Sequence, residues 1–221
     1  MAPDSQRFAE PLLTAAQAGA HLAVPRSTIN QWTAAGLLHG VVTAPRFEPT
    51  MPLVAVAQAQ VLHGLRRWGL SSAEIRRAAR RLRAEFGAYA LLTQRLASDG
   101  VSLLRNMSEP GDALAWERVA DGQAVLPKVV DDHVHYFEWD HEGYPQRLTL
   151  RSYAGHGADV VLDPRFGYGQ PVFAATKIRV SDVVRQFVAG EPTDQIADDY
   201  GLSPGEVDAV VAVLGVERAV A

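Results

Sequence analysis

The sequence contains no cysteine, which excludes disulfide bonds and metal sites built from thiolates. It also lacks any run of 18 apolar residues, so we expect no membrane-spanning helix. The first ten residues include Asp4, Arg7 and Glu10 and hold no apolar stretch of the kind that a signal peptide needs. We therefore expect a soluble cytoplasmic protein. Because 48% of the residues are apolar, we expect a packed core and not a disordered chain.

The charged side chains are distributed unevenly along the 221 residues. Residues 1–85 contain ten arginines and five acidic residues, a net charge of +5, whereas residues 108–221 contain nine basic and nineteen acidic residues, a net charge of −10. A basic surface attracts phosphate backbones and an acidic surface repels them. This pattern predicts that the N-terminal part binds nucleic acid and that the C-terminal part binds something else.

Near the N-terminus the residues favour two short helices joined by a tight turn. Thr14 suits the N-cap of an alanine-rich helix over Ala15–Leu22. Pro25 suits the first position of a second helix, and Gly36 suits its end. In that second helix Ile29 and Trp32 fall on one face, which we expect to be buried.

The following residues predict a small wing and two more helices. Three prolines separate short extended pieces between Val41 and Pro52, and we interpret this segment as the wing. An apolar stripe predicts a helix over Leu53–Trp68, and a capping-box pattern at Ser71–Glu74 predicts the next one. The outer faces of that last helix carry five arginines, at Arg76, Arg77, Arg80, Arg81 and Arg83.

From Tyr89 onward the apolar residues follow a strand-like period. Turn-forming dipeptides separate five predicted strands, which are Tyr89–Leu96, Val101–Asn106, Ala113–Val119, Val134–Trp139 and Arg147–Ser152. Helices are then predicted at Ser181–Ala189, Pro192–Tyr200 and Ser203–Leu214. The fold class is therefore α+β. We divide the chain into a DNA-binding head (1–86), an antiparallel β region (87–162) and a helical interaction domain (163–221).

Residues 13–38 and the run Leu65–Ile75 resemble the winged helix-turn-helix of MerR-type DNA-binding domains. The sequence departs from that pattern twice. The aromatic Gly-Tyr-Arg motif of the wing is replaced by Arg46–Pro49, and the long dimerisation helix is missing because Phe86-Gly87 ends the helical pattern. The resemblance implies that the head binds duplex DNA.

In a helix-turn-helix the first residues of the second helix contact base edges. At those positions this chain has side chains that can pair with bases, namely Arg26, Ser27, Thr28, Asn30 and Gln31. Three further residues are expected to contact phosphates, namely Thr14, Arg46 and Arg67.

The C-terminal sequence is similar to a short domain of unknown function that occurs in antitoxins. The similarity lies in the turn Gly169–Val172, the expected strand Thr176–Val180 and the helix that follows Gly190-Glu191. Those antitoxins neutralise PIN-like ribonuclease toxins. Together with the head, the sequence looks like a VapB-type antitoxin. That resemblance implies a ribonuclease partner, autoregulation through operator DNA, a homodimer and no catalysis or cofactor of its own.

The last two predicted helices carry acidic residues where a DNA-binding helix would carry basic or amide side chains. These residues are Asp194, Asp198, Asp199, Glu206 and Asp208. We interpret them as a surface that contacts the basic rim of the toxin. Arg218, in the tail after Gly215, is the candidate for insertion among the catalytic carboxylates of the toxin, with Lys177 and Arg179 as alternatives.

Two other functions remain open at the sequence level. One is a MerR-like one-component transcriptional regulator whose β region binds a small ligand. The other is a metal-dependent enzyme, because His133 and His135 alternate along a predicted strand at a spacing that two metal ligands can use. The same strand face continues with Phe137 and Trp139, which is typical of a packed sheet, so the antitoxin interpretation is preferred.

Overall fold

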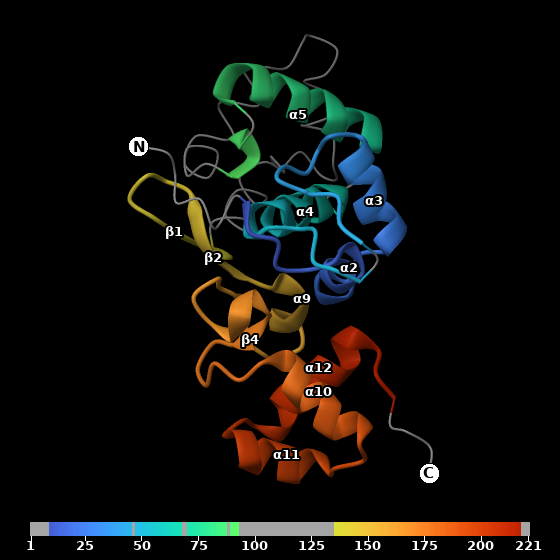
Figure 1. Ribbon diagram of the computed structural model, residues 1–221, viewed down its shortest axis with the longest axis vertical. Helices are drawn as coiled ribbons and strands as arrows, with labels where there is room; N and C mark the ends of the chain where they lie inside the picture. The colour runs from blue at the N-terminus through green and yellow to red at the C-terminus, as the bar shows by residue number, and fades with distance from the viewer. Residues whose placement is uncertain (1–8, 46, 68–69, 88, 93–134, 218–221) are drawn as a thin grey trace, which may run out of the picture.

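The computed structural model describes residues 9–45, 47–67, 70–87, 89–92 and 135–217 (Figure 1). Within these ranges the elements are, in chain order, α2 (Ala15–Leu22), α3 (Arg26–Ala34), α4 (Leu53–Arg67), α5 (Ser72–Phe86), the 3₁₀ helix η1 (Ala90–Leu92), β1 (Phe137–Trp139), β2 (Pro145–Thr149), α9 (Arg151–Ala154), β3 (Val160–Leu162), the 3₁₀ helix η2 (Gly167–Gly169), β4 (Val172–Phe173), α10 (Val180–Val188), α11 (Thr193–Tyr200) and α12 (Pro204–Leu214). This mixture of helices with one antiparallel sheet confirms the α+β class. No helix in the described ranges is long and apolar enough to cross a membrane.

Side-chain capping fixes where several helices begin. Thr14, Ser71 and Ser203 each form a capping box, in which the hydroxyl accepts a hydrogen bond from the N–H three residues ahead. The first two caps were predicted from the sequence and are confirmed. At the other end, Gly201 and Gly215 adopt left-handed backbone conformations that end α11 and α12.

The four strands form a sheet in the order β1-β2-β3-β4, with every neighbour antiparallel. Gln60 connects this sheet to α4, because its side-chain amide donates to the carbonyl of Thr149 (3.0 Å) and accepts from the N–H of Arg151 (3.2 Å). Gln60 therefore joins the last residue of β2 to the first residue of α9. Since Gln60 is only 8% exposed, these bonds satisfy a buried amide.

Four predicted strands differ from the structure. In Val134–Trp139 the strand begins only at Phe137, because residues 135 and 136 form a turn. In Tyr89–Leu96, residues 90–92 form η1, where the consecutive burial of Leu91 and Leu92 fits a helical turn and not an alternating strand. In Arg147–Ser152, the strand ends at Thr149 and α9 begins at Arg151.

The predicted strand Thr176–Val180 is instead a turn followed by a helix. Lys177 has φ 61, which breaks an extended conformation, and only the isolated bridge between Val172 and Arg179 remains. The predicted strands Val101–Asn106 and Ala113–Val119 lie outside the described residues.

The segment interpreted as a wing contains no paired strand among its described residues. A hydrogen bond from the N–H of Val42 to the carbonyl of Thr50 (3.0 Å) closes the loop. Met51 then forms an isolated antiparallel bridge with Leu13, which anchors the loop to the residue before the cap of α2. The structure therefore shows a closed loop at this position.

The N-terminal and C-terminal segments share one hydrophobic core. His21 of α2 and Tyr153 of α9 form a buried hydrogen bond between Nδ1 and the phenolic oxygen (2.6 Å). The hydroxyl of Ser152 also donates to the carbonyl of His21. Further along the chain, the amide of Gln170 donates to the carbonyl of Leu12 (2.8 Å). Figure 1 shows α9 lying beside α2. In the same view α10 and α12 lie below α9, nearer to the end of the chain marked C.

Candidate functional site

Helices α2 and α3 pack closely at the turn that joins them. A Cβ atom on Gly19 would lie 2.6 Å from the carbonyl oxygen of Val24, so only glycine permits this approach. Ala23 at the turn has φ 54, a left-handed conformation. Ile29 and Trp32 are buried, as the sequence predicted. The helix pair is therefore fixed by backbone packing on one side and by apolar burial on the other.

The predicted base-contacting residues lie mostly on the exposed side of α3. Arg26, Ser27, Asn30 and Gln31 are exposed, whereas Thr28 is partly buried. Helical geometry places the four exposed residues within an arc of about 140°, since successive residues are 100° apart. Four of the five predicted side chains can therefore meet the same ligand.

The structure describes two of the three residues that were predicted to contact phosphates. The Thr14 hydroxyl accepts a hydrogen bond from the N–H of Gln17 (3.1 Å), and as a hydroxyl it retains a proton to donate. Arg67 is exposed at the last position of α4. Arg46 lies outside the described residues.

Arg67 lines a small basic cavity between the α2–α3 turn, α4 and α9. The cavity measures about 50 Å³ and is lined by Leu22, Ala23, Gln60, His63, Gly64, Arg67, Arg151 and Ser152. No acidic residue is among these eight. Burial, followed by the charges of Arg67 and Arg151, lowers the pKa of His63, so its imidazole is neutral at pH 7. The residues that line the cavity therefore include two arginines and no acidic residue, next to the turn that leads into α3.

The acidic residues proposed to contact a toxin belong to α11 and α12. Asp194, Asp198, Asp199 and Asp208 are exposed. Glu206 is partly buried. Its carboxylate accepts hydrogen bonds from the N–H (2.8 Å) and the hydroxyl (2.9 Å) of Ser203. Glu206 thus has a structural role as part of the cap of α12.

Two of these carboxylates occupy an unfavourable electrostatic position. Asp198 and Asp199 lie in the last turn of α11, where the helix dipole is negative, whereas Asp194 lies in its first turn, where the dipole is positive. Acidic residues at a helix C-terminus cost stability, typically about 0.3–1 kcal/mol each.

Other predicted site residues are less informative. Val207 and Val210 of α12 are buried in the core, whereas Val211 and Leu214 are partly exposed. Arg218 and His133 lie outside the described residues. His135 is exposed, and the described residues contain no cluster of three groups able to hold a metal ion.

A polar loop after β3 was not identified from the sequence. The carboxylate of Asp163 is 1% exposed and accepts from the guanidinium of Arg165 at two atoms (2.9 and 2.7 Å) and from its backbone N–H (2.9 Å). Burial acts to raise the pKa of Asp163, but the hydrogen bonds from Arg165 and the charges of Arg165 and Arg147 outweigh it, so the pKa is lowered.

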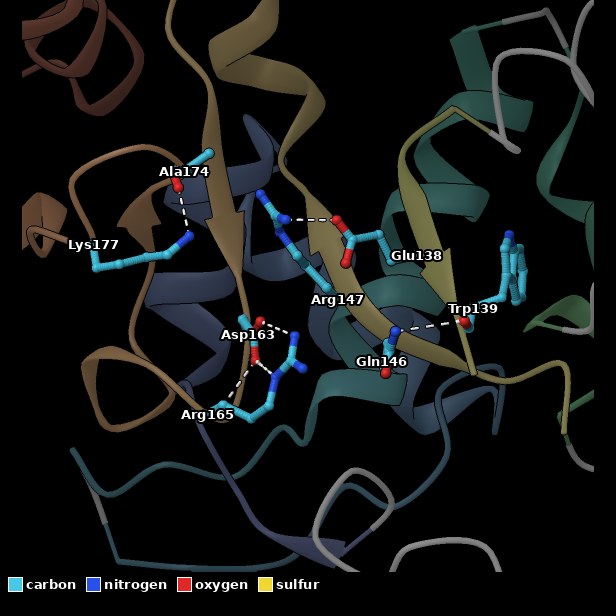
Figure 2. Close-up of polar contacts among 8 residues, drawn as sticks. All are labelled: Glu138, Trp139, Gln146, Arg147, Asp163, Arg165, Ala174 and Lys177. Atoms are coloured by element: carbon cyan, nitrogen blue, oxygen red, sulfur yellow. Dashed lines mark hydrogen bonds and ion pairs between the residues drawn. The ribbon is translucent and has the colours of Figure 1, made fainter. Parts of the chain in front are cut away.

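Figure 2 shows Arg165 folded back onto Asp163, Arg147 paired with Glu138 (2.5 Å), and the ammonium group of Lys177 directed at the carbonyl of Ala174 (2.5 Å). Tyr168, in the loop between Arg165 and Lys177, is exposed, and its only sequence signal is an aromatic residue between two glycines.

Comparisons with known proteins match most of the chain. Residues 160–212 match a family described as a protein of unknown function (DUF433). Over 231 aligned positions, which cover 94% of this chain and 95% of the relative, the sequence is 33% identical to a protein of Mycobacterium tuberculosis (strain ATCC 25618 / H37Rv) named "Putative antitoxin VapB45". A crystal structure of Rv2018 from Mycobacterium tuberculosis is also similar, with a TM-score of 0.77 and 31% identity over 93% of this chain and 99% of that one.

Proposed function

We propose that this chain, which belongs to the family of the mycobacterial protein VapB45, is an antitoxin that neutralises a PIN-like ribonuclease and binds the operator DNA of its own operon. The antitoxin role is supported by the similarity over nearly the full length of both chains. The ribonuclease partner, the DNA binding and a homodimeric state are our extensions of that role. The head (1–86) would bind DNA, while the β region (87–162) and the C-terminal domain (163–221) would bind the toxin.

The observation that best supports DNA binding is the exposed set Arg26, Ser27, Asn30 and Gln31 on a closely packed helix pair. Arginine can form two hydrogen bonds with guanine, and glutamine or asparagine can do so with adenine. Arg67 and the basic cavity beside it would bind a backbone phosphate in this proposal. The basic charge of residues 1–85 adds an attraction to DNA that salt weakens.

Replacement of Arg26 and Gln31 by alanine tests this interface. If Arg26 contacts a base, Arg26→Ala weakens binding to the upstream duplex by about 1–3 kcal/mol, because a base-specific pair of hydrogen bonds is lost. Titration of labelled DNA in a gel-shift assay measures the change. Arg185→Ala is the matched control, since it removes the same charge from the acidic C-terminal region and should change binding little. Equal affinity of the Arg26→Ala/Gln31→Ala protein and the wild type would contradict the proposed interface.

Toxin binding is supported by charge. The exposed carboxylates of α11 and α12 are complementary to the basic surface that a ribonuclease presents to RNA, and complementary charge accelerates association. The position of Asp198 and Asp199 against the helix dipole is consistent with a binding role for both. We further propose that Arg218 inserts among the catalytic carboxylates of the toxin.

The direct test is co-expression with the protein encoded by the neighbouring gene. We expect the two proteins to co-purify and the full-length chain to abolish ribonuclease activity at equal stoichiometry. Light scattering of the free chain tests the homodimer separately. A neighbouring gene product that neither binds the chain nor cleaves RNA would contradict the antitoxin–ribonuclease assignment.

A further inference from the structure

The loop after β3 holds an aromatic side chain outward in a strained conformation. Tyr168 has φ 56 and ψ 36, the left-handed region that side chains with a Cβ seldom adopt, and it is 93% exposed. No burial of the ring offsets the conformational cost. Residues held in such conformations concentrate at sites of function.

The neighbouring glycines fix this conformation. Gly167 and Gly169 also have positive φ values, of 59° and 73°. A Cβ atom on Gly167 would lie 2.5 Å from Cγ1 of Val172, and one on Gly169 would lie 2.4 Å from Cδ2 of Leu12. Both glycines are therefore packed against the rest of the protein, and Tyr168 between them points to solvent.

Hydrogen bonds along the loop add further rigidity. The N–H groups of Phe166, Gly169 and Gln170 donate to carbonyls three residues earlier, each at 3.0 Å. Arg165 is held by the carboxylate of Asp163, as Figure 2 shows. A loop that is ordered before binding loses little conformational entropy when a partner binds.

The loop that carries Tyr168 also presents cationic side chains, which are paired with carboxylates. The guanidinium groups of Arg165 and Arg179 face outward, with side chains 60% and 39% exposed. The carboxylates that pair with them lie beneath, because Asp163 is 1% exposed and Asp182 is 18% exposed. A partner therefore meets Arg165 and Arg179 before it meets the two carboxylates that pair with them.

Phe166 completes this surface. The guanidinium of Arg165 lies 5.8 Å from the centroid of its ring, and the ammonium group of Lys177 lies 5.0 Å from it. These are cation–π distances, so the ring helps to keep both cations at the surface. Arginine and aromatic residues side by side are the composition of interface hot spots.

We propose that Arg165, Phe166, Tyr168, Lys177 and Arg179, here called the Tyr168 surface, are the site where the toxin docks. Tyr168 enters a recess of the toxin as an anchor, and Arg165 and Arg179 donate hydrogen bonds to acidic residues at its edge. This inference rests on the proposed antitoxin function and adds a second contact area to the acidic helices.

A protein partner fits the Tyr168 surface better than a nucleic acid does. Residues 160–217 contain four basic and nine acidic residues, so a polyanion would be repelled by the rest of this segment. A protein with both basic and acidic surface can contact α11 and the Tyr168 surface without that repulsion. Within the Tyr168 surface, moreover, Tyr168 is the only aromatic side chain whose exposure is nearly complete, whereas strand-binding surfaces stack successive bases on several rings.

Tyr168→Gly separates a binding role from a structural one. Glycine adopts the left-handed conformation freely, so the variant should melt at the same temperature as the wild type or higher. Its affinity for the neighbouring-gene product, measured by calorimetry with the full-length chain, should fall about 30-fold or more, the loss that corresponds to a hot spot of about 2 kcal/mol. Binding of operator DNA should not change.

Two arginines that share one carboxylate provide a matched pair of variants. Arg179 and Arg185 both pair with Asp182, so removal of either leaves that carboxylate with a partner. Arg179→Gln should weaken toxin binding and make it less sensitive to salt, whereas Arg185→Gln should have little effect. Phe47→Ala, which removes an exposed aromatic ring from the head, controls for loss of an aromatic residue elsewhere.

The outcomes distinguish this inference from the function on which it rests. If the wild type binds the neighbouring-gene product and Tyr168→Gly binds it equally well, the docking site is wrong and the antitoxin role stands. Failure of the wild type to bind that product would overturn both. Binding of a labelled oligouridine by the wild type, lost in Tyr168→Gly, would show a nucleic-acid surface and would also overturn the proposal.

Discussion

His21 and Tyr153 form the buried polar contact that joins α2 to α9. Burial lowers the pKa of His21 to about 4, so the imidazole is neutral at pH 7. Burial also raises the pKa of Tyr153, so its hydroxyl keeps a proton that it can donate to Nδ1 of His21. Burial therefore favours the neutral form of both side chains in this contact.

This neutral histidine predicts how stability depends on pH. The folded-state pKa of His21 is lower than the unfolded value of 6.5, so its contribution is complete above pH 6.5 and decreases as the pH falls toward 4. Between pH 7.5 and pH 5 the free energy of unfolding should fall by about 2 kcal/mol from this residue alone. Urea unfolding at both pH values measures the change. His21→Gln should reduce the difference, and an equally large difference in that variant would assign it to other groups.

The α2–α3 pair depends on a glycine because the two helices approach through backbone atoms. Gly19→Ala would place a Cβ 2.6 Å from the carbonyl oxygen of Val24, so the helices must separate. We expect a loss of stability of about 1–3 kcal/mol, as for other overpacked sites, together with weaker operator binding. Gly205→Ala is the control, since no atom lies within 4 Å of its added Cβ. Thermal unfolding compares the two, and an equal stability of both variants would show that the close contact is unimportant.

The helices were predictable from the sequence because their ends carry local signals. The N-caps Thr14, Ser71 and Ser203 define where α2, α5 and α12 begin. The glycine stops Gly190 and Gly201 end α10 and α11 in the same local way. Such signals act within one turn of the chain, so a single sequence is enough to find them.

The short strands and α9 were less predictable because long-range contacts define them. β3 is buried on both faces and shows no alternation of apolar and polar residues, and β4 has only two residues. The β2–α9 junction depends on Gln60, which is about 90 residues away in sequence and satisfies the N–H of Arg151. No sequence pattern near residue 150 predicts that hydrogen bond.

The candidate site, like the fold, was predictable from the sequence only where local patterns define it. The exposed positions on α3 follow from helical periodicity once the buried pair Ile29 and Trp32 is recognised. The Tyr168 surface does not follow from periodicity. Its geometry depends on Leu12 and Val172, which pack against the two loop glycines, and on Asp163, which binds Arg165. The cavity beside Arg67 likewise requires α9, which the sequence did not reveal.

At the scale of the whole molecule, the regions proposed for DNA and toxin binding are packed together. α12 packs against α2 and α9, and the Tyr168 loop packs against Leu12 just before α2. β3 pairs with β4, although β3 lies in the proposed β region (87–162) and β4 lies in the proposed C-terminal domain (163–221). The segment from Gly169 to α12 is therefore in direct contact with the helix pair that would contact DNA.

This packing predicts that the chain unfolds as one cooperative unit. Separation of the C-terminal domain would expose Leu12, break the hydrogen bond of Gln170 and remove β4 from the sheet, so neither part has a complete core alone. Calorimetry of the full-length chain should show one transition whose van't Hoff and calorimetric enthalpies agree. Gln170→Ala should shift that single transition to lower temperature without splitting it, because the buried segments on both sides still depend on each other. Two resolved transitions in the wild type would show instead that the head and the C-terminal domain unfold independently, so that packing between them would not connect the proposed toxin site with the helices proposed to bind DNA.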